Sequence, residues 1–539
     1  MQVKVPTAAR AAAARVPALL TAPVLTAPVL AALVPALVML VLGLWGLERG
    51  TVWRDEGATL QVARRSLPEI WHLLHHVDAV HGLYYVLMHA LLPVDPGEFA
   101  LRLPSVLAAS AAAALVAALG TRLARPRVGL WAGLLYAVTP MAGHYAQEGR
   151  SYALVAAGAA LATLLLTRAV DRPERPSAWC AYAAAAVGTA LLHELAALLL
   201  LAHAATLLLS RAPRTVWRAW ALAAGAVCVL LLPLLLVSGG QSAQVSWLVA
   251  PDGAAADRLL RSFAGPTSLV LVGQLLLAVL ALRRPWRRGG RLALPAVALP
   301  LLVLPPAVLF AVSQGWPLYH DRYVLFALAG LPLLVAAGAD RAVRGLGRLP
   351  RPGLGRLPGP GLGRLPRPGF ARPRGAVAVV GAVAVGLTLW WQLPLHRVDR
   401  AVGHGREDPA AASTVAARAL RPGDPVLFLP AIARRVALVY PDGFRGGRDL
   451  ALAASPAASG TLYGVEADPA ELRRRLASVD RIWVVAEPST LRHSREYAVR
   501  GGLWAGSADE AKLAVLDREF TARTLHKVPG ATLRLYVRR

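Results

Sequence analysis

Two adjacent carboxylates, Asp55 and Glu56, follow directly after an apolar run in the stretch TVWRDEGATL, residues 51–60. Only 17% of the 539 residues are charged, so an acidic pair at this place needs a reason. A carboxylate that meets water just above a bilayer can accept a proton from a hydroxyl nucleophile. The pair therefore indicates general-base chemistry, provided that the preceding apolar run crosses a membrane.

Two arginines supply complementary chemistry: Arg150 in HYAQEGRSY (144–152) and Arg322 in YHDRY (319–323). A guanidinium offers two parallel donors to phosphate oxygens. With Asp55 or Glu56 as the base and the arginines as phosphate clamps, the set could transfer a group from a lipid phosphate to an alcohol. The departing lipid phosphate leaves as a stabilised anion and needs no general acid, so one carboxylate could be enough.

Further polar side chains accompany these groups where the apolar pattern is interrupted. Tyr323 joins the two arginines as a phosphate-binding candidate, and the candidates for lining the site are Asp78, His81, Tyr84, Glu148, Tyr152 and His193. Simpler roles stay open for some of them. Glu148 and Arg150 could form a local ion pair, His193 and Glu194 could stabilise a helix bundle, and an arginine at a helix end can be a membrane-surface anchor.

Composition places these residues in a membrane protein. Hydrophobic residues make up 56% of the chain and the mean hydropathy is +0.49, which is more apolar surface than a soluble domain could bury. The formal net charge of +27 would suit a nucleic-acid binder only if the basic residues gathered on one face of a folded domain. They instead form short clusters between apolar runs, which argues against a nucleic-acid partner.

Two groups of residues could bind a metal by type, but their positions in the sequence favour structural roles. Cys180 and Cys228 fall within predicted spans, so we expect core packing, with no disulfide framework and no cysteine-based metal site. His72, His75 and His76 stand at helical spacing and are interpreted as a solvated helix face. The sequence indicates no required cofactor and leaves a divalent metal open.

Eleven stretches are apolar enough, over roughly 20 residues, to cross a bilayer. They cover residues 26–46, 101–121, 128–142, 152–168, 178–192, 195–210, 219–237, 267–282, 292–312, 323–339 and 376–393. The stretch LYYVLMHALL (83–92) is too short for a further span. We expect it to lie along the membrane surface, with Tyr84 and Tyr85 at the level of the lipid headgroups.

Arginine clusters give the predicted topology, because short basic loops stay in the cytoplasm. Every second loop is basic, from Arg10 and Arg15 before the first span to the arginine-rich segment after the tenth. This alternation predicts a cytoplasmic N-terminus and an extracytoplasmic C-terminus. All the polar motifs then fall in external loops, above all in the long first loop, 47–100. Acidic groups at membrane depth are costly enough that they usually mark a site.

The predicted organisation has five parts. A cytoplasmic tail (1–25) precedes a membrane core (26–340), and a cytoplasmic linker (341–375) carries the repeat GLGRLPRP, GLGRLPGP, GLGRLPRP. The last membrane helix (376–393) leads to an extracytoplasmic α/β domain (396–539). Its expected strands are 426–429, 482–486 and 533–537, and its expected helix 468–479 has Asp468 as cap and Pro469 at the first position.

Taken together, the motifs resemble the family 39 type of membrane glycosyltransferase within the GT-C fold class. The segments that carry the resemblance are WRDEG (53–57), DAVHGLYYVLMH (78–89), ALRLPSVLAA (100–109), YAQEGRSYAL (145–154) and HDRYVLFALAGLPLL (320–334). The resemblance covers residues 45–340, and the region 396–539 is similar to the extracytoplasmic tail often attached in bacterial members. The expected fold is a GT-C-like, all-α transmembrane bundle of about 11 helices with a C-terminal extracytoplasmic α/β domain.

The resemblance implies a polyprenyl-phosphate sugar donor, commonly of mannose, and inversion at the anomeric carbon. It identifies Asp55, with Glu56 beside it, with the catalytic aspartate of the first loop. It matches Arg150 and Arg322 to positions that approach the donor phosphate. Asp78 and His81 match a second patch of the first loop; there many relatives carry a Pro-Pro pair before Leu-Tyr-Tyr, whereas a single Gly82 stands here. The shape of the acceptor entrance is left open by this difference.

The expected function is an inverting glycosyltransferase, specifically a mannosyltransferase, on the outer face of the cytoplasmic membrane. Its partners would be a polyprenyl-phosphate sugar, an acceptor hydroxyl on a glycan, lipid or protein, and membrane lipid. The competing interpretation is a polytopic transporter or lipid flippase. Such proteins place charges near the bilayer midplane and show paired halves, and neither pattern is visible in this sequence.

Overall fold

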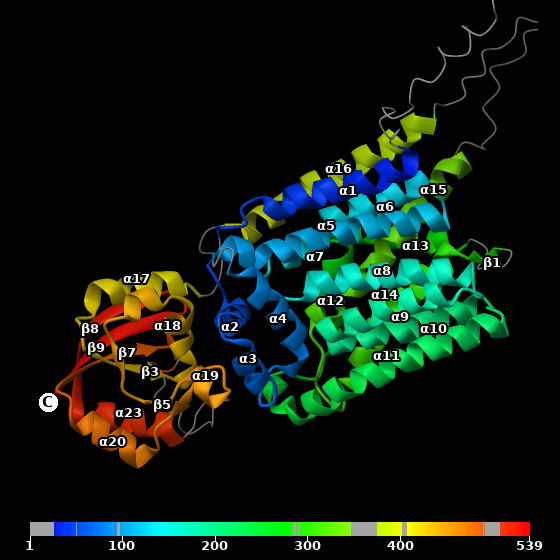
Figure 1. Ribbon diagram of the computed structural model, residues 1–539. Coiled ribbons are helices and arrows are strands. Elements are labelled where there is room, and N and C mark those ends of the chain that lie inside the picture. The colour runs from blue at the N-terminus through cyan, green and yellow to red at the C-terminus, as the bar shows by residue number, and fades with distance from the viewer. Residues whose placement is uncertain are drawn as a thin grey trace, which may run out of the picture.

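The computed structural model describes residues 26–49, 51–93, 97–283, 287–288, 291–346, 374–401, 407–488, 490 and 507–539. It consists of a bundle of long helices and a smaller domain built on a sheet, which lies at one end of the bundle (Figure 1). Between the two parts lie three short helices, α2 (Arg54–Ala63), α3 (Leu67–Leu74) and α4 (Gly82–Leu91). The predicted N-terminal tail and most of the predicted linker lie outside the described residues.

Each of the eleven predicted spans overlaps a helix of the bundle. These helices are α1 (Ala27–Leu44), α5 (Glu98–Leu123), α6 (Pro126–Val138), α8 (Tyr152–Val170), α9 (Pro176–Leu192), α10 (Leu198–Leu209), α11 (Arg214–Gly240), α13 (Ser268–Leu282), α14 (Leu294–Val312), α15 (Gly330–Leu346) and α16 (Arg374–Asp399). They run side by side along the bundle (Figure 1). The predicted span 323–339 begins in a 3₁₀ helix (Asp321–Ala329) that precedes α15. The expected polytopic helical architecture is confirmed.

Within the described residues, seven helices are long and apolar enough to cross a membrane, or eight if the bent pair of α12 (Gly253–Ala264) and α13 is one span. The remaining predicted spans fall on the shorter helices α6, α9 and α10. The predicted span 128–142 is interrupted, because α6 ends at Val138 and the separate helix α7 (Pro140–Ala146) follows. Proline has no N–H for the helical ladder, so Pro140 starts a new helix and does not continue the old one.

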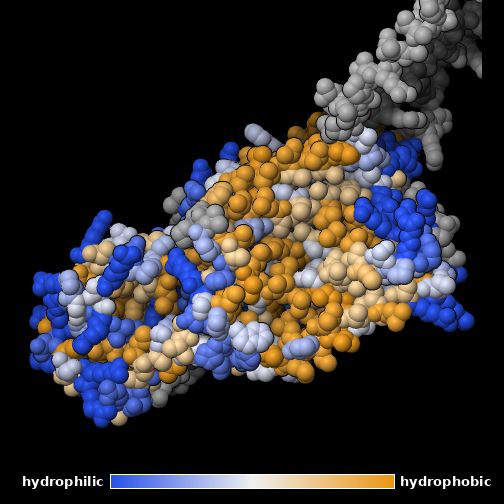
Figure 2. Space-filling view, in the orientation of Figure 1, coloured by the Kyte–Doolittle hydropathy of each residue, from blue (hydrophilic) through white to orange (hydrophobic). Residues whose placement is uncertain are grey.

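The outer surface of the bundle carries large apolar side chains, as expected for contact with hydrocarbon. Leu222 and Leu236 of α11 and Leu269 of α13 are 78%, 69% and 78% exposed. Figure 2 shows this apolar surface as a broad zone along the bundle, with hydrophilic residues at both ends. A patch of this size would be an aggregation hazard in water and suits a bilayer.

Inside the bundle, helices approach closely where side chains are small. Gly129 of α6 faces the backbone of α5, and a Cβ added there would lie 2.3 Å from the carbonyl oxygen of Ala117. Only glycine permits this contact, in the manner of small-residue interfaces between membrane helices. The two helices are thereby held at backbone distance along the centre of the bundle.

Four residues are placed differently from the sequence-based expectation. Tyr84 and Tyr85 of α4 are fully buried in protein, so their expected position among the lipid headgroups is wrong. Burial of the polar end of Tyr85 is possible because its hydroxyl donates a hydrogen bond to Asp78. Cys180 of α9 and Cys228 of α11 are exposed on the outside of the bundle, so their assignment to core packing is wrong as well. The thiol is small and weakly polar, so an apolar exterior accommodates it.

The C-terminal domain contains a five-stranded sheet with the strand order β4-β3-β7-β9-β8. The strands are β3 (Pro425–Leu429), β4 (Arg448–Asp449), β7 (Arg481–Ala486), β8 (Phe520–Val528) and β9 (Ala531–Arg538). β4, β3 and β7 are parallel, whereas β9 pairs antiparallel with β7 and with β8. The helices of this domain include α17 (Pro409–Ala419), α18 (Arg435–Val439), α20 (Pro469–Ala477) and α23 (Ser507–Glu519). The expected α/β domain is confirmed, including the Asp468 cap, which accepts hydrogen bonds from Ala470 N and Glu471 N.

Several polar contacts hold the C-terminal domain against α2. Arg54, the first residue of α2, lies 3.5 Å from Glu407 and 3.3 Å from Glu487, and both carboxylates also pair with Arg435 of α18. Arg65 donates to the carbonyl oxygen of Thr461 at 2.9 Å. The domain thereby braces the helix that carries Asp55.

The polar motifs and the arginine clusters of the described chain lie at opposite ends of the bundle. The turns α8–α9 and α10–α11, which carry Arg172, Arg175 and Arg211, lie at the end away from the C-terminal domain (Figure 1). The loops that carry Asp55, Arg150 and Arg322 start or end helices at the other end. This separation agrees with the alternation in the sequence, and the side of the membrane on which each end lies stays a prediction.

Candidate active site

Asp55 stands in the first turn of α2, where the unpaired N–H groups of a helix N-terminus favour a negative charge. Its Oδ2 lies 2.9 Å from Nη1 of Arg322, and the Asp55 side chain is 22% exposed. Its other oxygen has no hydrogen-bond partner among the described residues. Asp55 is therefore an accessible carboxylate with one oxygen free to accept a proton.

Aromatic rings surround the guanidinium of Arg322. Its central carbon lies 5.8 Å from the ring centroid of Trp53, 5.5 Å from that of Tyr152 and 5.6 Å from that of Tyr323. Cation–π contacts of this kind orient a guanidinium while leaving its edge for a ligand. Nε of Arg322 is buried and has no partner. Arg322 is thus held in place with donor capacity unused, as a phosphate-binding arginine requires.

Glu56 is buried and fully occupied. Its two oxygens accept hydrogen bonds of 2.8 Å from Nε and Nη2 of Arg102 in α5, and Oε1 also accepts from Gly149 N at 2.7 Å. A carboxylate with these partners and 1% exposure cannot reach a substrate hydroxyl. The geometry does not support the predicted catalytic role of Glu56. It makes Glu56 a positioning residue that joins α2 to α5 and to the 148–151 loop.

Arg150 lies behind Asp55 in the interior. Its Nη1 donates to the backbone oxygen of Asp55 and to the hydroxyl of Thr59, both at 3.4 Å, and its Nη2 lies 2.5 Å from Nε2 of His81. Arg150 is 5% exposed, so in this arrangement it fixes the backbone that carries Asp55. The structure brings it to the site, and direct contact with a donor phosphate stays a prediction for which Arg322 is better placed.

The second patch of the first loop joins the same cluster. Asp78 adopts a left-handed backbone conformation, with φ of 58°, and its carboxylate accepts a hydrogen bond of 2.6 Å from Tyr85. Burial raises the pKa of Asp78. His81 accepts from Arg150 at Nε2, so its proton is on Nδ1, which is buried without a partner. Burial and the charge of Arg150 lower the pKa of His81 and keep the ring neutral.

An aromatic cluster completes the floor of the site. The ring centroid of His193 lies 4.8 Å from that of Tyr323, 5.9 Å from that of Tyr152 and 6.0 Å from that of His81. Burial lowers the pKa of His193 to about 3, so it stays neutral. Tyr84, also predicted to line the site, is buried one helical position from Tyr85. The structure therefore brings all the predicted site residues to one end of the bundle.

Glu148 is the second acid near Asp55 and differs from it in environment. It is buried, with Oε1 lacking a partner and Oε2 3.9 Å from Nε2 of His144. Burial raises the pKa of Glu148 to about 7, although His144 and Arg322 act in the opposite direction. The alternative of a local ion pair between Glu148 and Arg150 is not formed among the described residues, since Arg150 is engaged with α2 and His81.

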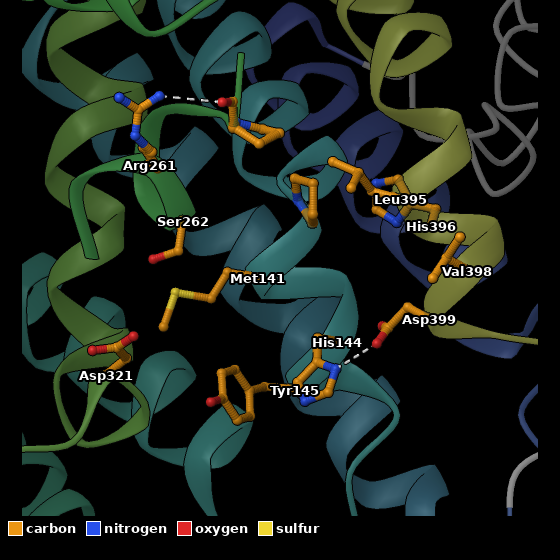
Figure 3. A pocket seen from close by; sticks show the side chains of 12 residues that line it. Met141, His144, Tyr145, Arg261, Ser262, Asp321, Leu395, His396, Val398 and Asp399 are labelled. Atoms are coloured by element: carbon orange, nitrogen blue, oxygen red, sulfur yellow. Dashed lines mark hydrogen bonds and ion pairs between the residues drawn. The ribbon is translucent and has the colours of Figure 1, made fainter. Parts of the chain in front are cut away.

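A cavity of about 460 Å³ lies beside this cluster, between α7, α12, α16 and the 3₁₀ helix η5 (Asp321–Ala329). Figure 3 shows its lining side chains, with Met141 and Leu395 on apolar walls and His144 joined to Asp399. It borders Asp321, the residue before Arg322. The cavity thus has one lining residue, Asp321, that is the chain neighbour of the phosphate-binding candidate Arg322.

Two residues of the site have no assigned role in the sequence interpretation. Trp53 stacks on Arg322, and Arg102 holds Glu56. Trp53 lies in the motif WRDEG (53–57), and Arg102 lies in the motif ALRLPSVLAA (100–109). The signal that identifies Arg102 is an arginine inside an apolar helix, because such a charge needs a buried partner.

The described residues contain no cluster of side chains suited to bind a metal ion. No group of three or more His, Cys, Asp or Glu side chains among them could hold a metal ion. His72, His75 and His76 are exposed on and beside α3, and Nδ1 of His75 lies 2.8 Å from the carbonyl oxygen of Trp71. This agrees with the interpretation of a solvated helix face. Dependence on a divalent metal stays a prediction.

Comparisons with known proteins support the fold. Residues 81–237 match the family model described as dolichyl-phosphate-mannose-protein mannosyltransferase. ArnT from Cupriavidus metallidurans in the apo state is similar with a TM-score of 0.56 and 14% identity, over 93% of this chain and 97% of that chain. The structure of ArnT bound to undecaprenyl phosphate gives a TM-score of 0.56 and 15% identity over the same shares. No curated protein matches the sequence significantly. The resemblance drawn from the motifs is thus confirmed for the architecture, and the chain has the fold of a GT-C membrane glycosyltransferase.

Proposed function

We propose that this protein is an inverting glycosyltransferase that moves a sugar from a polyprenyl phosphate to an acceptor hydroxyl. The observation that carries the proposal is the pair of Asp55 and Arg322, 2.9 Å apart and framed by Trp53, Tyr152 and Tyr323. It joins an accessible base to a cation suited to phosphate. The fold shared with ArnT, which has been seen with undecaprenyl phosphate, supports a lipid-phosphate donor.

In the proposed reaction, the acceptor oxygen attacks the anomeric carbon while the bond from that carbon to the phosphate oxygen breaks. Asp55 takes the proton of the acceptor hydroxyl through its free oxygen. The polyprenyl phosphate leaves with the bonding electron pair, and its negative charge is stabilised by Arg322. When donor binds, its phosphate would displace the Asp55 carboxylate from Arg322, so the base becomes available only with the donor in place.

Residues around the Asp55–Arg322 pair would position the catalytic loops and accommodate the donor lipid. Glu56 with Arg102 and Arg150 with His81 hold α2 and the 148–151 loop in register. The cavity beside Asp321 offers apolar walls for the first isoprene units of the donor lipid. All these groups lie at one end of the bundle. This distribution supports a surface reaction better than the midplane charges of a transporter.

For the sugar we propose mannose, because residues 81–237 match a family model described by mannosyl transfer. The localisation proposed for the site is the outer face of the cytoplasmic membrane, from the arginine distribution. The acceptor is proposed as a hydroxyl on a glycan, a lipid or a protein.

The test is transfer of labelled mannose from polyprenyl-phosphate mannose in native membrane vesicles that contain either the intact protein or Asp55→Asn. Loss of a positioned base is expected to lower turnover by about 10² to 10⁴-fold. The matched control is Asp257→Asn, which removes an exposed aspartate of α12 that, among the described residues, pairs with Arg261 one turn away and with no other side chain. We expect turnover of this control to stay within twofold, roughly the effect of a surface substitution.

The outcomes separate the parts of the proposal. Normal turnover by correctly inserted Asp55→Asn would remove Asp55 as the base. Transfer from another polyprenyl-phosphate sugar, but not from the mannose donor, would overturn the assignment of mannose as the sugar and leave the glycosyltransferase assignment standing. Failure with a panel of such donors, at full insertion, would overturn the glycosyltransferase assignment.

A further inference from the structure

A second polar cavity lies at the end of the bundle away from the C-terminal domain. It has a volume of about 600 Å³ and lies where α5 and α8 end, α9 begins and the short strand β2 (Arg291–Leu292) passes. Five arginines and one carboxylate contribute to its lining, namely Arg122, Arg168, Arg172, Arg175, Arg291 and Asp171. It shares no residue with the candidate active site.

Most of this positive charge is not neutralised. Arg122 is occupied, because it pairs with Asp171 at 2.5 Å and donates to the hydroxyl of Thr167 at 2.8 Å. The other four guanidinium groups make no ion pair and no side-chain hydrogen bond with the described residues. Four mutually repelling charges around one cavity raise each other's energy unless an anion joins them.

The local sequence explains why the charges converge. α8 ends at Val170 and α9 begins at Pro176, so the turn DRPER (171–175) carries Arg172 and Arg175 across the mouth of the cavity. Arg168 lies in the last turn of α8. The N-terminus of the 17-residue helix α9 contributes partial positive charge, and Ser177 in its first turn also lines the cavity.

We propose that this cavity binds a phosphate ester, carried either by the headgroup of an anionic membrane lipid or by a soluble phosphate compound. Guanidinium groups bind phosphate oxygens through paired donors, and four of them are available. The cavity is much larger than one phosphate, so it has room for the alcohol portion of an ester. Its position at the ends of bundle helices is the depth at which basic pockets meet anionic headgroups.

The experiment compares Arg168→Gln/Arg172→Gln with the intact protein. The matched control is Arg214→Gln/Arg218→Gln, which removes the same charge from exposed arginines at the start of α11, at the same end of the bundle. Native mass spectrometry of detergent-purified protein, with added phosphatidylglycerol or phosphatidylcholine, measures lipid retention. A parallel titration with glycerol 3-phosphate, followed by the thermal unfolding midpoint, measures binding of the soluble ester.

We expect the intact protein to retain phosphatidylglycerol over phosphatidylcholine. The Arg168→Gln/Arg172→Gln variant should lose roughly tenfold or more of this retention, and the control less than about twofold. Retention of the lipid without a response to glycerol 3-phosphate identifies a lipid site, and the reverse result identifies a soluble ester. Equal losses in both variants, or no binding in either arm by folded intact protein, would overturn the proposal. Because the four arginines are exposed, gel filtration of the variants is expected to match that of the intact protein.

Discussion

Arginines at the two ends of the bundle differ in burial and in their polar contacts. Next to the C-terminal domain, Arg102, Arg150 and Arg322 are largely buried, and each contacts a carboxylate, an imidazole or a backbone oxygen. At the other end Arg168 and Arg172 are exposed, and no ion pair joins them to any described residue. The same residue type therefore builds a rigid site at one end and an open, electrically unsatisfied surface at the other.

Burial accounts for the difference. A guanidinium removed from water must recover its hydration energy from fixed partners, whereas an exposed one keeps its water. The rule holds within the far end too, where the buried Asp340 is held by Arg127 at 2.6 Å and by Arg344 at 2.8 Å. Substitutions of the buried arginines at the site end should thus alter stability and catalysis, and substitutions of the exposed arginines at the far end should alter neither.

The largest effect is expected from Arg102→Leu, which leaves the carboxylate of Glu56 buried without its charged partner. Breaking such a pair costs about 3–5 kcal/mol. The measurement is the free energy of unfolding of the purified protein in detergent. The double variant Glu56→Leu/Arg102→Leu should recover part of the loss, since it leaves no buried charge.

Arg168→Leu is the control for this comparison, because it removes an exposed arginine of α8. Its effect should stay within about 0.5 kcal/mol. If both single variants lost the same stability, burial would not be the cause of the difference between the ends.

A smaller effect is expected from Arg322→Lys. The ammonium keeps the charge but loses the planar fork that stacks on the rings and donates in pairs. Loss of one hydrogen bond to a charged group predicts a fall in kcat/KM for the polyprenyl-phosphate donor of about 10 to 100-fold.

The matched substitution for Arg322 is Arg258→Lys. Arg258 also contacts a carboxylate, that of Asp321 at 3.4 Å, but its side chain is 62% exposed. An exposed pair contributes at most about 1 kcal/mol, so kcat/KM should change by less than about fivefold. An equal loss in both variants would show that general charge at this end, and not the geometry of Arg322, governs donor binding.

The smallest effect concerns the pH dependence of stability. In the unfolded chain Glu148 ionises near its ordinary pKa of 4.5, whereas burial in the folded chain raises the pKa to about 7. Between these values the folded chain holds a proton that the unfolded chain has released. This contribution to stability is complete below pH 4.5 and is lost as the pH rises to about 7. Unfolding midpoints measured across this range should therefore fall less steeply for Glu148→Gln than for the intact protein.

Glu174→Gln serves as the comparison for this titration, because Glu174 is exposed in the α8–α9 turn. Its pH profile should overlay that of the intact protein. A profile of Glu148→Gln that also overlays it would mean that Glu148 does not take up a proton on folding.

Sequence reasoning succeeded where the signal was local. The positions of the bundle helices follow from apolar length, and strands β3, β7 and β9 follow from short apolar runs, because both patterns are set by residues next to one another. The Asp468 cap is of the same kind. Sequence reasoning failed where a residue's surroundings come from other elements. Tyr85 is an example, because its hydrogen bond to Asp78 holds it inside the protein and away from the membrane surface.

The sequence by itself determined that this is a polytopic membrane protein with its acids, imidazoles and two key arginines in separate loops, since hydropathy and residue type are properties of the chain. Only the tertiary structure decided which of two adjacent carboxylates is available. Asp55 and Glu56 are neighbours in sequence, yet a helical step of one residue turns them to different sides of α2. One side faces Arg322 and the open site, and the other faces Arg102 in the packed interior.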